Sequence, residues 1–191
     1  MTRPIRSFIA LPLEPEIQQR LKIIQNELHR TGAEVKWVKA EQIHVTLKFL
    51  GEIESERLGT VKQILGQTIS PLKEFLLEID HLGAFPKLEN PKIIWVGAKS
   101  PGSVIQKMGS SLEEALEKAG FPKEERDFAP HITIGRLKGS LNRFALTQAM
   151  KKFTFHEPLV QLVKEVTLFQ STLLPQGPVY EALDVIQLKA G

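Results

Sequence analysis

The chain has 191 residues, and 42% of them are hydrophobic, which is enough to form a buried core without covalent crosslinks. It contains no cysteine, which excludes disulfides and thiolate metal sites. The net charge of +3 would help an anionic ligand approach, but it is too small for a surface that coats nucleic acid. No stretch approaches the roughly 18 apolar residues of a membrane span, and the first apolar run is too short for a signal peptide. We therefore expect a soluble, cytoplasmic protein.

Four segments have apolar residues at intervals of three and four, the spacing of an amphipathic helix. In the first of them these residues include Ile17, Leu21 and Leu28, and Gly32 follows as a stop signal. His29 falls in the last turn of this helix, where an imidazole interacts favourably with the helix dipole, so we interpret it as structural. The helices are expected at residues 14–30, 54–69, 104–119 and 141–152.

The segments between the helices have the alternation and the flanking turn residues of β-strands. Pro175, Gly177 and Pro178 mark the turn of a hairpin near the end of the chain. Gly83 to Pro91, rich in glycine, proline and asparagine, is expected to connect two strands. The strands themselves are expected at residues 5–11, 35–38, 43–50, 75–82, 93–96, from 131 onward, 160–171 and 179–188.

This order of elements predicts an α+β protein with antiparallel sheets and helices on their outer faces. No linker-like or low-complexity segment divides the chain, so residues 1–191 are expected to form one unit. Beyond one short repeated motif, the two halves share little that can be aligned by eye.

The repeated motif is a histidine, an apolar residue, a threonine and another apolar residue. It occurs as His-Val-Thr-Leu from His44 and as His-Ile-Thr-Ile from His131. Alternate side chains of a strand point to the same side, so each motif presents its histidine with Thr46 or Thr133 on one face. Two such strands facing a common groove would present two imidazoles and two hydroxyl groups. His81 has no threonine two residues on, and we interpret it as a loop or partly buried histidine.

Two histidines on opposite sides of a reacting centre can divide the proton transfers of a displacement at phosphorus. The neutral histidine takes a proton from water, and the protonated one gives a proton to the departing oxygen. Thr46 and Thr133 could donate hydrogen bonds to the non-bridging phosphate oxygens, where charge accumulates. The four groups together predict a phosphodiesterase site without metal. We find no glycine-rich phosphate loop or dinucleotide fingerprint, and we expect no cofactor.

Other interpretations of the motif residues and their neighbours stay open. A metal site is disfavoured, because threonine is a poor ligand and no carboxylate lies two or four residues from either histidine. Arg136 could contact RNA, but strict alternation would point it away from His131 unless Gly135 hosts a bulge. Lys48 shares the parity of the first motif, so it could face the groove and bind RNA, or be a solvated lysine at the end of a strand. Phe49 is expected on the core face.

These residues resemble those of the 2H phosphoesterases, and in particular the RNA 2′,3′-cyclic phosphodiesterases of the LigT/ThpR type, once described as 2′-5′ RNA ligases. The resemblance implies a bilobal fold, with two pseudo-symmetric antiparallel sheets flanking a central cleft and one motif from each lobe. It also implies hydrolysis of a terminal 2′,3′-cyclic phosphate to a 2′-phosphate. By the same resemblance, His44 is the proton donor, His131 the acceptor, and Thr46 and Thr133 bind phosphate. The similar stretches are residues 6–11, 44–51, 130–136 and 171–180.

Two other functions remain to be weighed. The same site run in reverse would join RNA ends through a 2′-5′ linkage. A protein of a different class would only bind RNA ends. The two histidines argue against that function, because hydroxyl groups and cations alone could hold phosphate. The expected partner is RNA with 2′,3′-cyclic phosphate ends, or a related nucleotide, and a monomer is expected.

Overall fold

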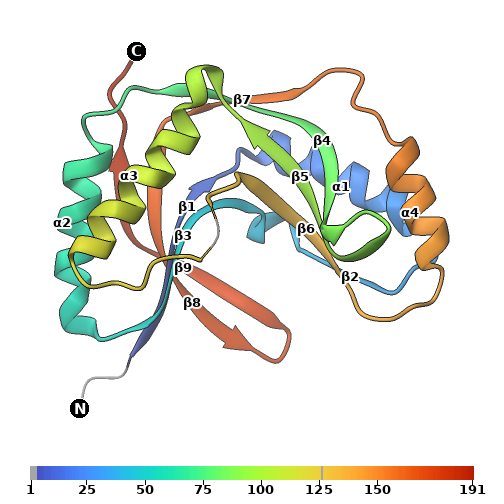
Figure 1. The fold of residues 1–191 in the computed structure, drawn as a ribbon, viewed down its shortest axis with the longest axis horizontal. Helices are drawn as coiled ribbons and strands as arrows, with labels where there is room; N and C mark the ends of the chain where they lie inside the picture. Colours follow the sequence, from blue (N-terminus) through green and yellow to red (C-terminus); the bar gives the residue numbers. More distant parts are fainter. Residues whose placement is uncertain (1–3, 126) are drawn as a thin grey trace.

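Two antiparallel sheets form the framework of the computed structural model, which describes residues 4–125 and 127–191 (Figure 1). The first sheet has the strand order β3-β1-β8-β9, and the second has the order β2-β6-β5-β4-β7. The strands of the first sheet are β1 (Ile5–Pro12), β3 (His44–Ile53), β8 (Glu165–Leu174) and β9 (Gly177–Gln187). Those of the second are β2 (Val35–Trp37), β4 (Phe75–Lys87), β5 (Asn90–Lys99), β6 (His131–Leu137) and β7 (Leu159–Val163).

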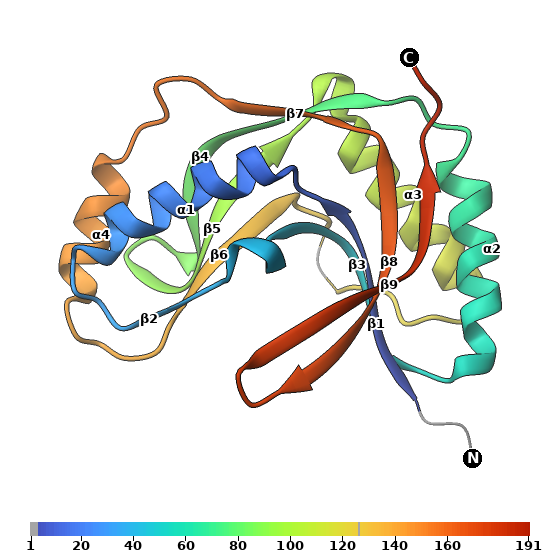
Figure 2. The ribbon, with the colours of Figure 1, turned by 180° about the vertical axis from the view of Figure 1, so that it is seen from behind.

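Each sheet is covered on its outer side by two helices, so the predicted α+β class and the two-lobed arrangement are confirmed (Figure 2). Helices α2 and α3 pack on the four-stranded sheet, whereas α1 and α4 pack on the five-stranded sheet. Within the described part of the chain, no helix is both long and apolar enough to cross a membrane. The helices are α1 (Pro15–His29), α2 (Leu58–Ile69), α3 (Val104–Lys118) and α4 (Arg143–Lys152), with short 3-10 turns η1 (Ala40–Gln42), η2 (Ser55–Arg57) and η3 (Pro101–Ser103).

The chain passes back and forth between the two lobes. Helix α1 directly follows β1 of the four-stranded sheet but packs on the other sheet, against β6 and β7. Helix α3 follows β5 of the five-stranded sheet but packs against α2 and β3. Each lobe is therefore built from both halves of the sequence.

The two motif strands lie beside each other where the sheets meet. Strand β3 is the edge of its sheet, and β2 pairs only with the last three residues of β6, from Gly135 to Leu137. The first half of β6 thus has no ladder partner on that side, and β3 lies close to it. This junction brings the two motifs together from positions far apart in the sequence.

The core is formed by apolar side chains of both the strands and the helices. Ile9 and Leu11 of β1 are fully buried, as are Leu21 of α1, Leu65 of α2 and Leu112 of α3. Each such side chain contributes about 1.5–3 kcal/mol through removal of its apolar surface from water. The helical faces expected from the apolar spacing are therefore the faces that cover the sheets.

Two expected segments differ from the structure. Residues 160–171 do not form one strand, because the chain leaves β7 in one sheet at Val163 and enters β8 in the other sheet at Glu165. The segment 83–91 is mostly strand rather than a connection. Gly83 supports that strand because the ring of Trp95 packs over it, where a Cβ atom would lie 2.2 Å from the ring.

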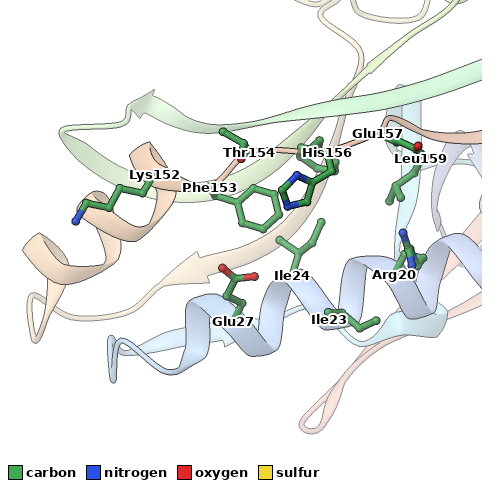
Figure 3. A pocket seen from close by; sticks show the side chains of 11 residues that line it. Arg20, Ile23, Ile24, Glu27, Lys152, Phe153, Thr154, His156, Glu157 and Leu159 are labelled. Carbon is green, nitrogen blue, oxygen red and sulfur yellow. The ribbon is translucent and has the colours of Figure 1, made fainter.

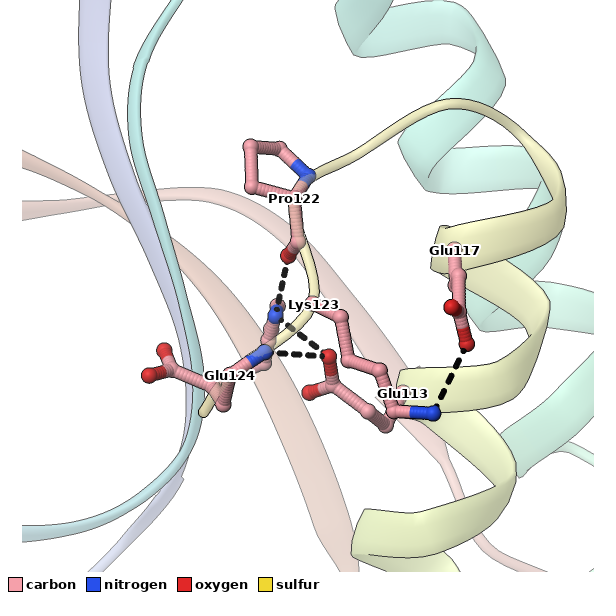
Figure 4. A network of polar contacts seen from close by, with 6 residues as sticks. Glu113, Glu117, Pro122, Lys123 and Glu124 are labelled. Carbon is pink, nitrogen blue, oxygen red and sulfur yellow. Dashed lines mark hydrogen bonds and ion pairs between the residues drawn. The ribbon is translucent and has the colours of Figure 1, made fainter. Parts of the chain in front are cut away.

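A buried ion pair joins β3 to α3 and to the segment that leads to β6 (Figure 4). Lys48 is only 3% exposed, and its Nζ donates to Oε1 of Glu113 at 2.7 Å and to the carbonyl oxygen of Pro122 at 2.7 Å. The same Glu113 oxygen accepts a hydrogen bond from the backbone N–H of Glu124 at 2.9 Å. One charge pair thus holds the first motif strand, a helix and the loop before the second motif.

Removal of the Lys48 ammonium should destabilise the fold. In Lys48→Met, the Glu113 carboxylate loses its cation and the Pro122 carbonyl loses its donor. Because the Glu113 side chain is 19% exposed, we expect the free energy of unfolding to fall by about 2–4 kcal/mol, somewhat less than for a fully buried pair. Urea denaturation measures this change.

The matched control is Glu117→Gln, in the same part of α3. Glu117 forms a solvent-exposed ion pair with Lys123 at 3.2 Å, and loss of such a pair should cost less than about 1 kcal/mol. Equal losses in the two variants would contradict the role given to Lys48.

Candidate active site

The two motif histidines have the same backbone hydrogen bond. Nδ1 of His44 lies 2.8 Å from the carbonyl oxygen of Gln42, and Nδ1 of His131 lies 2.8 Å from the carbonyl oxygen of Ala129. A carbonyl accepts but cannot donate, so each Nδ1 carries a proton and each Nε2 is the nitrogen that can gain or lose one. The two rings are thus held in the same tautomer, with the same atom available for proton transfer.

Each motif strand also contains a β-bulge directly after its threonine. In the β1–β3 ladder, Ala10 pairs with Thr46 and Ile9 pairs with Lys48, so Leu47 is the extra residue. In the β5–β6 ladder, the residues that pair with Trp95 and Ile94 are Thr133 and Gly135, so Ile134 is the extra residue. A bulge interrupts the alternation, and the residues that follow it change faces.

The first bulge corrects two expectations. Lys48 was expected either to face the groove, with a possible role in RNA binding, or to be solvated; instead it is buried against Glu113. Phe49 was expected on the core face with Leu47, but it is 56% exposed. Both differences arise because the extra Leu47 shifts the alternation by one residue. Lys48 is therefore not available to contact RNA.

The second bulge places Arg136 on the same face of β6 as His131 and Thr133. Strict alternation would turn Arg136 towards the core, and only a bulge would redirect it. The structure selects the alternative in which a bulge redirects it, and Arg136 is exposed. We call the surface that carries His44, Thr46, His131 and Thr133 the motif face, so Arg136 belongs to the motif face as well.

His44 lies in an aromatic cluster. The ring of Phe8 stacks on it with a centroid distance of 4.8 Å, and Tyr180 meets it edge-on at 5.4 Å. Burial lowers the pKa of His44 below its ordinary value, and the bond to the Gln42 carbonyl opposes this only in part. The surroundings of His44 therefore favour the neutral form of its ring.

His131 has different neighbours. Phe85 meets it edge-on at 5.0 Å, and Trp95 lies 6.1 Å away, measured between ring centroids. Gly97 pairs with His131 in the β5–β6 ladder, and the ring of His81 covers Gly97, where a Cβ atom would lie 1.9 Å from it. A third imidazole therefore lies next to the second motif on the same sheet.

His81 lies in β4, within the strand expected at residues 75–82, and its side chain is 58% exposed, so it is neither a loop residue nor partly buried. Its Nδ1 bonds Asp80 at 2.7 Å, and Asp80 also forms an ion pair with Lys99 at 2.5 Å. Asp80 and His81 lie at an irregularity of β4 opposite Gly97. The alternation pattern does not reveal this irregularity, so the sequence did not indicate that the His81 ring covers Gly97.

Tyr180 of the four-stranded sheet lies beside His44. It belongs to β9, contacts His44, and lies close enough to Arg6 and Arg136 for both guanidinium groups to affect its ionisation. Burial raises the pKa of its hydroxyl, and the two cations oppose that shift. The sequence contained Tyr180 within a stretch of family resemblance, but no local pattern indicated its contact with His44.

A pocket lies away from the motif residues. It has a volume of about 520 Å³ and is formed between α1 and residues 152–159, with Arg20, Phe153 and His156 among its lining (Figure 3). None of the four motif residues lines it. Among residues 4–125 and 127–191, no three histidine, aspartate or glutamate side chains are placed to hold a metal ion together.

A two-lobed α+β fold with a histidine–threonine pair on each of two adjacent strands defines the class of two-histidine phosphoesterases. The chain belongs to the LigT-like phosphoesterase family, whose model matches it twice, over residues 11–95 and 96–180. Each match contains one of the two motifs. The family unit therefore occurs in both halves, although the halves could not be aligned by eye.

Similar proteins agree with this assignment. The chain is 32% identical to the RNA 2′,3′-cyclic phosphodiesterase of Methanothermobacter thermautotrophicus, over 96% of this chain and 99% of the relative. It is 33% identical to the protein of the same name from Archaeoglobus fulgidus, over 96% and 100%. Among solved structures, Escherichia coli LigT in complex with 3′-AMP has a TM-score of 0.78 and 25% identity, over 97% of this chain and 99% of that chain. The chain is thus a phosphoesterase.

The pKa of His44 can be measured by NMR titration of its ring. Burial disfavours the imidazolium form, so the midpoint should lie below 6.5, the ordinary value. Tyr180→Ala opens one side of the ring to water and should raise the midpoint towards 6.5. Tyr180→Phe keeps the ring and should leave the midpoint unchanged. A midpoint at or above 6.5 in the native protein would contradict this description of the cluster.

Proposed function

We propose that this chain hydrolyses the terminal 2′,3′-cyclic phosphate of RNA to a 2′-phosphate. The observation that carries the proposal is the pair of histidines with matching carbonyl bonds, His44 to Gln42 and His131 to Ala129, on two adjacent strands. The substrate is proposed because the relatives that match nearly the whole chain bear the name RNA 2′,3′-cyclic phosphodiesterase.

In the proposed reaction, Nε2 of His131 takes a proton from water as the water oxygen bonds to phosphorus. The bond from phosphorus to the ribose 3′ oxygen breaks, and Nε2 of His44 gives that oxygen its proton. Thr46 and Thr133 donate hydrogen bonds to the non-bridging oxygens. No step uses a metal ion. Because one histidine must be neutral and the other protonated, the rate should pass through a maximum as pH is varied.

The donor role of His44 depends on the substrate. Burial lowers the pKa of His44, so the protein around the ring disfavours the protonated form that a donor needs. The bound phosphodiester carries a negative charge, and a nearby opposite charge favours the imidazolium. The negative charge of the bound substrate therefore favours the protonated form of its own proton donor.

Two further features belong to the proposal. The chain acts as one bilobal, monomeric unit with one motif from each lobe. Ligation through a 2′-5′ linkage is the same displacement with an RNA 5′-hydroxyl in place of water: its oxygen bonds to phosphorus, and the 3′ oxygen departs with a proton. A protein that only binds RNA ends is disfavoured because binding alone would not need two imidazoles with the same free nitrogen.

Single substitutions test the two histidines. His44→Ala and His131→Ala should each lower the turnover of an oligonucleotide ending in a 2′,3′-cyclic phosphate by about 10²- to 10⁴-fold. The double variant should lose less than the product of the two effects, because the groups act on one transition state. Circular dichroism should show an unchanged fold. Near-native turnover in either single variant would remove that histidine from proton transfer.

Threonine variants should lower the rate less than the histidine variants do. Thr46→Val and Thr133→Val keep the shape but remove the hydroxyl, and each should reduce transition-state stabilisation by roughly 1.5–3 kcal/mol. Unchanged rate and affinity in both would remove the threonines from the site.

The product and the effect of chelation test the reaction as a whole. We expect activity to survive excess EDTA and phosphorus NMR to show a 2′-phosphate with a free 3′-hydroxyl. A 3′-phosphate as the main product would mean that the 2′ oxygen departs, which contradicts the assignment of His44. Loss of activity with EDTA that a divalent ion restores would favour a metal-dependent diesterase.

A further inference from the structure

Two cations lie opposite each other on neighbouring strands, beside the second motif. Lys36 of β2 pairs with Arg136 of β6, and residues directly opposite in an antiparallel ladder point to the same face. The bulge at Ile134 puts Arg136 on the motif face, so Lys36 lies on the motif face too. Both side chains are exposed.

This pairing is electrostatically unfavourable on its own. Like charges directly opposite each other destabilise an antiparallel pair, whereas an acid at position 36 would stabilise it. In the part of the chain that the structure describes, neither Lys36 nor Arg136 forms an ion pair with an acidic side chain. An anionic ligand would therefore relieve the repulsion. A lysine on an edge strand also discourages pairing with other chains, but that role requires no arginine opposite it.

The pair borders the candidate active site. Arg136 lies near enough to Tyr180 to affect its ionisation, and the Tyr180 ring contacts His44. Along β6, Arg136 lies roughly 7–10 Å beyond Thr133, which is the proposed ligand of the reacting phosphate. A second anionic group on the same substrate would thus meet Lys36 and Arg136 while its first phosphate meets the motifs.

We propose that Lys36 and Arg136 together bind the phosphate on the 5′ side of the terminal nucleoside, the next phosphate of an RNA chain. This inference rests on the proposed function and specifies its substrate. The protein then distinguishes the end of a nucleic acid chain from a free nucleoside 2′,3′-cyclic phosphate, which has no second phosphate.

Three substrates test the subsite: adenosine 2′,3′-cyclic phosphate, its 5′-phosphorylated form, and a dinucleotide ending in a 2′,3′-cyclic phosphate. We compare the kcat/KM of each between the native protein and Lys36→Gln. The ratio of the dinucleotide to the unphosphorylated mononucleotide should fall about 5- to 10-fold in the variant, because a charge-assisted contact to the second phosphate is lost. The same ratio for the 5′-phosphorylated mononucleotide should fall similarly if the subsite binds a terminal phosphate. A fall of the ratio for the dinucleotide alone means that the subsite binds a phosphodiester, which also supports the proposal.

Two control variants isolate the charge and its position. Lys36→Arg should restore the native ratio, and Lys22→Gln, on an exposed position of α1, should leave it unchanged. Added salt should reduce the dinucleotide preference of the native protein more than that of Lys36→Gln. If Lys36→Gln lowers kcat/KM by the same factor for all three substrates, or leaves the ratio of dinucleotide to mononucleotide unchanged, the proposed subsite is wrong and the hydrolytic function stands. If the native protein hydrolyses none of them, the proposed function itself fails.

Discussion

One extra residue in each motif strand determines which side chains surround the histidines. Leu47 and Ile134 are the bulged residues, and each follows its threonine directly. Without these bulges, Lys48 would lie on the motif face and Arg136 would point into the core. The bulges reverse both directions, so a lysine becomes part of the internal scaffold and an arginine joins the motif face. Both motif strands have this bulge, but the residues that follow it differ, so the two histidines have different neighbours.

That difference extends to the rings around each histidine. His44 is enclosed by Phe8 and Tyr180, while His131 lies against Phe85 and near the more accessible His81. Burial in this cluster lowers the pKa of His44. The backbone hydrogen bonds of the two imidazoles are the same, so the difference between them lies in the rings that surround each one. The common geometry thus leaves the same ring nitrogen free in both histidines, in two different aromatic environments.

Much of the fold could be predicted from the sequence, because helical spacing and strand alternation report burial directly. The helices, the first motif strand and the α+β class were all recovered in this way. The predictions failed where a local departure from alternation changes the face of a side chain, as for Phe49 and Lys48. They failed also where one apolar run serves two sheets, as around Lys164 between β7 and β8. Contacts such as Tyr180 with His44 depend on how the lobes are joined, which no local pattern encodes.

The crossing of the chain between lobes has a consequence for how the molecule comes apart. Because α1 and α3 each pack on the sheet opposite to the one they leave, neither lobe contains a continuous segment that could fold by itself. Opening one sheet would strip a helix from the other and expose part of its core. The two lobes are therefore coupled in unfolding, and we expect the whole chain to unfold in a single cooperative transition.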